Sequence, residues 1–308
     1  MLINKKKILI FGVIACILSL ILNIVNIQVH KISEPIVLEH YLEVSLHDEI
    51  DLSINYITNR RDSIKINSIY FPKYDLTFYD KNFQDTNSLK YYNSNTAVLN
   101  TRLNLDQQKE YEEMDNIILE DAVIMYNNGL EQNIDIGKII ISNNKEKGLH
   151  STMSSSSSTG FSKTVFELDN SIIINDITSE LYEETHNFVK MNLVSNDELD
   201  NTLVNISKET DKDKIMEIED NYHNNQKDIE CYPVDELQLP FQAYNTLSVN
   251  TNFEMLDNDC KYNVYDIRYT LHSTDENGNE GSQSLYNIRY SPYFTDKLVR
   301  QLVKKRGL

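Results

Sequence analysis

The most strongly patterned part of the chain is an uninterrupted apolar run near its start. Residues 8–27 read ILIFGVIACILSLILNIVNI and contain no charged side chain. A helix of twenty residues is about 30 Å long, which matches the hydrocarbon core of a bilayer. Three lysines at 5–7 precede the run, and only Lys31 follows it closely. Because basic residues favour the cytoplasmic side, the sequence predicts a single-pass anchor with residues 1–7 cytoplasmic, a stalk at 28–35 and an extracytoplasmic C-terminal part.

Two other export signals compete with this interpretation. The run contains one alanine, Ala15, and no A-x-A-like site follows it, which disfavours a simple cleaved signal peptide. The segment Val13-Ile14-Ala15-Cys16 resembles a lipobox, which would make Cys16 a lipidated N-terminus. Cleavage there would leave residues 17–27 as an apolar start of the mature chain, which is unusual for a lipoprotein. We favour the uncleaved anchor and keep the lipoprotein as the alternative; both place the remaining chain outside.

Beyond the stalk, apolar and polar residues alternate with a period of two. Ile50, Leu52, Ile54 and Tyr56 alternate with polar residues, which is the pattern of a half-buried strand. Asn128-Gly129 indicates a hairpin turn. Short strands without intervening helices predict an antiparallel, β-sandwich-like region at 36–194. The predicted strands are residues 36–46, 50–56, 64–71, 75–79, 97–105, 117–126, 134–142, 171–178 and 187–194.

Two segments interrupt the alternation. Residues 151–160 read STMSSSSSTG, a serine-rich composition that predicts a mobile loop. Residues 195–231 are acidic, and Ser195 with Glu198 resembles a capping box at the start of a helix. We therefore expect an acidic helical connector there.

A second β module with a C-terminal helix is predicted at 232–308. Alternation at 265–271 and again at 286–290 indicates a hairpin. The following helix carries Phe294, Leu298 and Leu302 on one side, and we expect it to cover the final β module. The fold prediction is therefore an N-terminal transmembrane helix followed by a mainly β ectodomain.

The charge of the chain excludes nucleic acid as a partner. The formal net charge is −18, and residues 8–295 carry 21 basic against 46 acidic side chains. A body this acidic repels phosphate backbones and offers no basic stripe from which counterions would be released.

Motifs for catalysis or for cofactor binding are missing from the sequence. It contains no G-x-G-x-x-G, P-loop, G-x-S-x-G or H-E-x-x-H pattern. Ser142 and Lys145 have the S-x-x-K spacing without its companion elements. His40 and His47, seven residues apart on a strand, would point to opposite faces. We therefore predict no catalytic residue, no cofactor and no metal ligand.

A weak calcium-loop candidate lies in the last hairpin. Asp275, Asn277 and Asn279 follow a D-x-N-x-N spacing. A calcium loop of the EF-hand type needs glycine at position six and glutamate at position twelve, where this chain has Glu280 and Tyr286. An Asn/Gly-rich hairpin connection explains the same residues, and we favour it.

Two of the three cysteines lie outside the predicted membrane anchor. Cys231 and Cys260 could form one disulfide in an exported protein. The alternative is two thiols on neighbouring strands.

No motif connects the sequence to an activity, so the functional prediction rests on layout. We expect a non-enzymatic, membrane-anchored extracytoplasmic binding or accessory protein whose partner is a protein or a wall polymer. The alternatives are a cell-envelope hydrolase that uses acidic residues, or a ligand-sensing subunit of a membrane complex.

The predicted topology can be tested with protease. When protease is added to intact, wall-stripped cells, nearly everything beyond the stalk should be digested, because the lysine asymmetry keeps only residues 1–7 inside. Immunoblotting against the body and a cytoplasmic marker measures this. Survival of both would show that the orientation is reversed.

Overall fold

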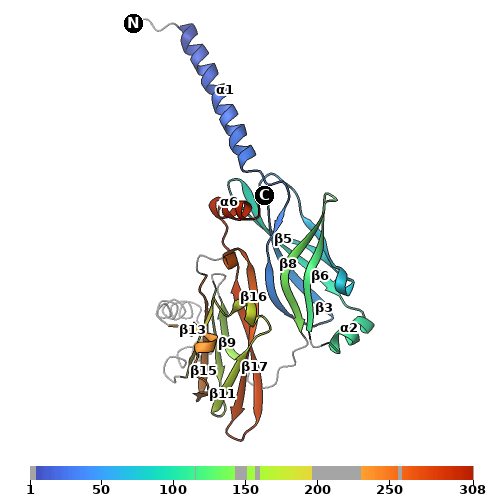
Figure 1. Cartoon of the computed structure of the whole chain (residues 1–308), viewed down its shortest axis with the longest axis vertical. Helices are drawn as coiled ribbons and strands as arrows, with labels where there is room; N and C mark the ends of the chain where they lie inside the picture. Colours follow the sequence, from blue (N-terminus) through green and yellow to red (C-terminus); the bar gives the residue numbers. More distant parts are fainter. Residues whose placement is uncertain are drawn as a thin grey trace, which may run out of the picture.

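The structure, a computed structural model, describes residues 5–114, 116–142, 151–156, 160–195, 230–255 and 259–307. Helix α1 (Lys5–Val29) stands away from the body with its side chains exposed from Leu9 onward (Figure 1). Its segment Leu9–Val29 has a mean hydropathy of 2.5, long and apolar enough to cross a membrane. The rest of the described chain is mainly β.

The body consists of many strands and a few short helices. Strands that precede the serine-rich segment are β1 (Ile36–Val37), β2 (His40–Ser45), β3 (Glu49–Asn59), β4 (Ile66–Phe71), β5 (Leu76–Ser88), β6 (Tyr92–Arg102), β7 (Asn116–Tyr126) and β8 (Glu131–Ser142). The later strands are β9 (Ser151–Ser156), β10 (Phe161–Glu167), β11 (Ile172–Thr178), β12 (Val189–Val194), β13 (Tyr232–Pro233), β14 (Phe241–Ala243), β15 (Thr246–Phe253), β16 (Val264–Asp275) and β17 (Glu280–Tyr290). The described helices of the body are α2 (Leu105–Glu112), α3 (Tyr182–Thr185) and α6 (Asp296–Lys305), with 3-10 turns η1 (Pro72–Tyr74), η3 (Val234–Glu236) and η4 (Asp259–Tyr262).

The first eight strands roll into a closed unit. Their order in the sheet is β1-β3-β6-β5-β4-β7-β8-β2, so the first and last strands of the series are β1 and β2. These two are consecutive in the chain, separated by only Leu38 and Glu39. One bent segment therefore pairs with β3 through β1 and with β8 through β2, and this closes the sheet on itself.

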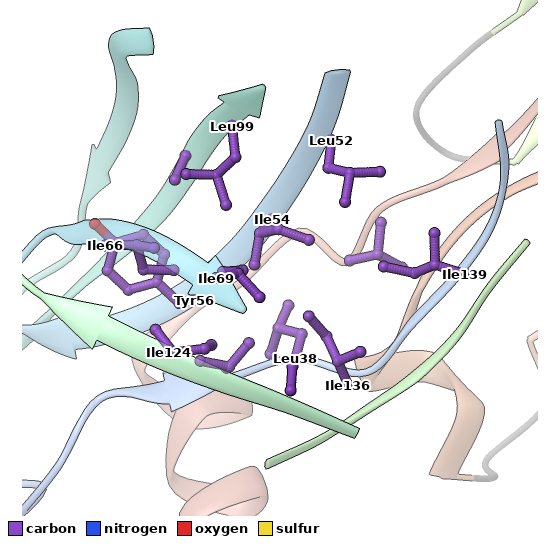
Figure 2. Packing of buried hydrophobic residues seen from close by; sticks show 14 of the residues in the cluster. Leu38, Leu52, Ile54, Tyr56, Ile66, Ile69, Leu99, Ile124, Ile136 and Ile139 are labelled. Carbon is purple, nitrogen blue, oxygen red and sulfur yellow. The ribbon is translucent and has the colours of Figure 1, made fainter. Parts of the chain in front are cut away.

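The interior of this unit is a hydrophobic cluster, here called the first core. Inward-facing positions of β3 alternate with exposed ones, as the sequence pattern predicts. Leu52 and Ile54 of β3, with Leu99 and Ile124, point toward one another across the interior (Figure 2). Each is at most 1% exposed.

A second unit packs two layers of strands around another hydrophobic cluster, the second core. Strand β16 continues the large sheet beyond β2 and is followed by β11 and β14, with β17 on its other side. A separate five-stranded sheet has the order β13-β12-β15-β10-β9. Phe166, Met191 and Val249 from this smaller sheet are buried in the same cluster as Tyr269 and Leu285 of the large sheet. The two layers thus form a sandwich in the lower part of the molecule (Figure 1).

The predicted hairpins are confirmed, and so is the predominance of β structure. Strands β7 and β8 pair across the Asn128-Gly129 turn, where Gly129 has a φ of 82°. Strands β16 and β17 form the second hairpin. The expectation of purely antiparallel sheets is wrong, because β2 pairs in parallel with both β8 and β16.

The serine-rich segment is not wholly a loop. Residues 151–156 form β9, which pairs with β10 at the edge of the smaller sheet. An edge strand needs backbone hydrogen bonds on one side only, so serine side chains are compatible with it. The acidic helices predicted in the connector lie at 196–229, outside the described residues.

The second core contains strands from both sides of the connector predicted at 195–231. Strands β10, β11 and β12 precede the connector in sequence, yet they share the second core with β15, β16 and β17. The boundaries at 36–194, 195–231 and 232–308 remain predictions about independent modules. In the structure, one core joins residues from both sides of the connector.

The C-terminal helix covers the first core, not the final β module as predicted. Val299 and Leu302 of α6 are buried in the first core, together with Phe294 just before the helix. Leu298 is only partly buried. The helix begins at Asp296, with Thr295 as its N-cap, and Val299 takes the fully buried position that the sequence pattern assigned to Leu298.

His40 is the junction between the two units. It is the first residue of β2, is fully buried, and lies opposite Gly137 of β8 and Val264 of β16. Its Nε2 accepts a hydrogen bond of 2.9 Å from the backbone N–H of Asn55 on β3. Three strands therefore meet at this one residue, β3 at its imidazole and β8 and β16 at its backbone.

Gly137 permits the close approach of β8 to this junction. A Cβ at Gly137 would lie 2.5 Å from the carbonyl oxygen of His40, and the residue has a φ of +92°. Both conditions exclude a larger side chain there.

The junction predicts a loss of stability in acid. Burial lowers the pKa of His40 from 6.5 to about 4, because the buried site disfavours the charged imidazolium. Below pH 6.5 the His40 imidazole binds a proton in the unfolded chain but stays neutral in the folded chain. The free energy of unfolding should therefore fall by about 3 kcal/mol between pH 6.5 and 4. Denaturant unfolding of the detergent-solubilised chain measures this. His40→Gln should lose this pH dependence, whereas exposed His47→Gln should keep it; an unchanged slope in His40→Gln would refute the assignment.

Candidate functional site: a cleft between β2 and β3

A cleft opens where the bent segment leaves β3. Strand β1 pairs with β3 only at Ile36 and Val37, after which the chain turns away to run beside β8 and β16. The divergence leaves a cleft of about 670 Å³. Its lining comes mainly from β2, β3, β16 and β17, with Thr96 of β6, so both units contribute to it.

One wall of the cleft is an open strand edge. Alternate residues of a strand direct their N–H and C=O groups to opposite sides. The Asn55 N–H and C=O bond to His40 and Leu38, so the odd-numbered residues of β3 face away from β6. Ser53 and Asp51 follow this alternation. No described strand pairs with β3 on this side between Glu49 and Ile54, so the backbone groups of Ser53 and Asp51 face the cleft.

The opposite wall carries a fixed arginine. Arg268 of β16 is 5% exposed and donates from Nη2 to the Ser45 hydroxyl at 2.8 Å. Its guanidinium lies 4.6 Å from the ring centroid of Tyr286 on β17. Stacking and hydrogen bonding hold the planar group in one orientation.

Glu43 lies beside this arginine. One of its carboxylate oxygens accepts from the Arg268 backbone N–H at 3.4 Å and from the Ser179 hydroxyl at 3.2 Å. Burial raises the pKa of Glu43 to about 7, and the nearby Arg268 charge opposes the rise without cancelling it. The carboxyl therefore holds its proton to a higher pH than an ordinary glutamate does.

A surface ion pair borders the same cleft. Arg289 Nε donates to Asp266 at 2.8 Å, and burial raises the pKa of the Asp266 carboxyl despite this partner. His47 and Ser291 line the cleft as well. Polar and charged groups therefore surround an open strand edge.

The predicted site residues lie elsewhere. Cys231, before β13, and Cys260, in η4, are separate thiols in the structure, and burial raises the pKa of Cys231 to about 11. The disulfide between them remains a prediction.

The calcium-loop candidate is closed by its own hydrogen bonds. Asp275 accepts from the backbone N–H groups of Asn277 and Asn279 and from the Asn279 amide, each at 2.8 Å. These bonds lower the pKa of the Asp275 carboxyl. The arrangement is that of a hairpin connection, and among the described residues no group of three or more His, Cys, Asp or Glu side chains could hold a metal.

Comparison with known proteins gave no family for the chain. No family model and no curated protein matches it. The fibronectin(III)-like modules of Clostridium thermocellum CbhA align over 86% of this chain and 96% of theirs, at 8% identity and a TM-score of 0.22. The Enterococcus faecalis MSCRAMM ACE, described as binding its ligands by the collagen Hug model, aligns over 83% and 93%, at 6% identity and a TM-score of 0.20. Scores this low carry no argument about function.

Because the Glu43 carboxyl is buried, we predict that replacing it with neutral glutamine stabilises the protein in a pH-dependent way. Above pH 7 the folded chain bears a buried charge at Glu43, whereas below pH 4.5 the carboxyl is neutral in both states. Glu43→Gln should therefore raise the free energy of unfolding at alkaline pH by up to about 3 kcal/mol, with no gain below pH 4.5. Exposed Glu131→Gln is the control, and equal effects of the two variants across the pH range would contradict the prediction.

Proposed function

We propose that the protein is a membrane-anchored binding protein that holds an extended segment of a protein partner in the cleft between β2 and β3. The observation that carries this proposal is the open edge of β3, with the backbone groups of Ser53 and Asp51 facing the cleft. An extended peptide adds to such an edge as a further strand, and its main-chain hydrogen bonds provide affinity without a requirement for sequence.

The walls of the cleft suit this mode of binding. Exposed edges cause uncontrolled pairing between chains, so natural proteins usually cover or shorten them. Here the edge is recessed between two units, which restricts access to a single extended segment. Arg268, fixed by Ser45 and Tyr286, supplies a directional donor group for the side chain or carboxylate of that segment.

The anchor belongs to the same proposal. The segment Leu9–Val29 of α1 is predominantly apolar, and its side chains are exposed. An exposed apolar helix of this length is stable when lipid surrounds it. We propose that α1 spans the cell membrane, with the β body outside and the N-terminus in the cytoplasm.

An envelope hydrolase is the second candidate, and one observation favours it. Glu43 has a pKa of about 7 and lines the same cleft as Asp266, so a general acid and a second carboxylate line one cavity. If the cleft is catalytic, Glu43→Gln abolishes turnover. If the cleft only binds, Glu43→Gln leaves binding intact, since glutamine keeps the acceptor oxygen.

Photo-crosslinking in living cells tests the binding proposal. A benzophenone amino acid at exposed Ser53 should crosslink to a partner protein, and the crosslinked peptide should map to an extended segment of it. The same amino acid at exposed Asn67 on β4, outside the cleft, is the control. Equal yields at the two positions would refute the cleft as the binding site.

A backbone change separates strand addition from side-chain contact. Ser53→Pro removes an N–H that faces the cleft and no hydrogen bond to β6, so thermal unfolding should change little. The crosslink from a second probe at Tyr286 should fall at least about tenfold, because loss of one main-chain hydrogen bond, with the partner carbonyl left unpaired, costs about 1.4 kcal/mol or more. A full crosslink yield in Ser53→Pro would argue against strand addition.

A further inference from the structure

The end of the body beside α1 is basic, although the body as a whole is acidic. Residues 8–295 carry 21 basic against 46 acidic side chains. Seven exposed basic side chains gather at this end, and we call them the basic collar: Lys31, Arg60, Arg61, Lys90, Lys297, Arg300 and Lys304. They come from four segments that are far apart in the sequence.

Tyr91 fixes the collar to the base of α1. The Asn26 amide donates to the Tyr91 hydroxyl at 2.8 Å, and the His30 ring stacks on the Tyr91 ring with centroids 4.0 Å apart. The Asp296 carboxylate accepts from the backbone N–H groups of Lys90 and Tyr91, at 3.2 Å and 3.0 Å. These contacts join the end of α1 to the beginning of α6, which lies beside the base of α1 (Figure 1).

Helix α6 has one apolar and one basic face. Val299 and Leu302 are buried in the first core, whereas Lys297, Arg300 and Lys304 are exposed. The three basic residues follow at intervals of three and four, so they lie on one side of the helix. The buried apolar residues and the exposed basic residues therefore lie on different sides of α6, so the helix can pack on the first core and present its charges to the outside.

The collar is not neutralised within the body. None of its seven side chains forms an ion pair with a described residue. Asp62 and Asp296 adjoin collar residues in the sequence, and their carboxylates accept from the Asn59 amide and from backbone N–H groups. Seven cations at one end of an acidic body are thus available to an external anionic surface.

We propose that the basic collar binds the headgroups of anionic phospholipids in the leaflet from which the body emerges. This inference rests on the proposed membrane anchoring by α1. Basic side chains near an anionic bilayer are attracted to it within about a Debye length, about 8–10 Å at physiological salt. An anionic membrane would otherwise repel this acidic body. The collar offsets that repulsion and orients the cleft relative to the bilayer.

Energy transfer in nanodiscs tests the collar with the full chain. The three native cysteines are changed to serine, and a donor dye is placed on exposed Gln301→Cys in α6. An acceptor dye is carried on a lipid headgroup, in discs of phosphatidylcholine alone or mixed with phosphatidylglycerol. Transfer should be higher in the mixed discs, and added salt should reduce it.

Charge variants decide between lipid contact and chance proximity. Lys297→Gln, Arg300→Gln and Lys304→Gln together should abolish the dependence on phosphatidylglycerol, since each basic residue contributes about fivefold, or about a hundredfold for three, to close contact. The matched control changes Lys73, Arg102 and Lys109 to glutamine. Strand β6 begins at Tyr92, beside the collar, and ends at Arg102. Helix α2, which carries Lys109, follows that far end, so the control residues Arg102 and Lys109 are remote from α1.

The outcomes separate the two proposals. Equal transfer in the two kinds of disc, or an unchanged lipid dependence in the α6 variant, would overturn the collar while leaving the anchor in place. Failure of the full chain to enter discs at all would instead refute the anchor.

Discussion

One hydrogen bond, from the Asn55 N–H to the imidazole of His40, allows the segment of β1 and β2 to pair first with β3 and then with β8 and β16. In a regular antiparallel ladder the Asn55 N–H would bond to the carbonyl of Leu38, which lies opposite. Here Leu38 donates to Asn55, and the ring of His40 accepts in return. The chain can therefore bend away from β3 without leaving a buried donor unsatisfied, a loss that costs about 1–3 kcal/mol. The closure of the first core, the parallel pairing with β16 and the cleft all follow from that bend.

The same bend explains why the cleft has polar walls within a hydrophobic body. Once β2 separates from β3, the strand edge it leaves can be satisfied only by water or by another chain. The first core lies behind β3 and the second core lies behind β16. The cleft between them is therefore lined by polar side chains that belong to neither hydrophobic core. Arg268 and Glu43 are examples, for each is largely withdrawn from solvent yet bonded to polar partners.

Much of the fold follows from local sequence pattern. The alternation at Ile50 to Tyr56 and the Asn128-Gly129 turn specify strands and a hairpin that the structure contains. Pairings between distant segments carry no local signal. Nothing in the sequence near His40 indicates parallel partners at Gly137 and Val264, and Arg268 bonds to a residue 225 positions away. The site could not be predicted for that reason: its members are unremarkable residues on strands, brought together only by the topology. The serine-rich composition of β9 predicted a loop where the structure has a strand, since backbone pairing at a sheet edge does not depend on side-chain hydropathy.

The order of the strands along the chain determines when each core can be completed during folding. Biosynthesis delivers the chain from its N-terminus, but the first core lacks Val299 and Leu302 until these residues have been made. The second core likewise needs β15, β16 and β17 to cover strands made much earlier. Both cores stay incomplete until the end, and contacts between distant segments form slowly. Nascent chains of this protein therefore expose apolar strands until the late segments have been made, and exposed apolar strands favour aggregation, which chaperones counteract.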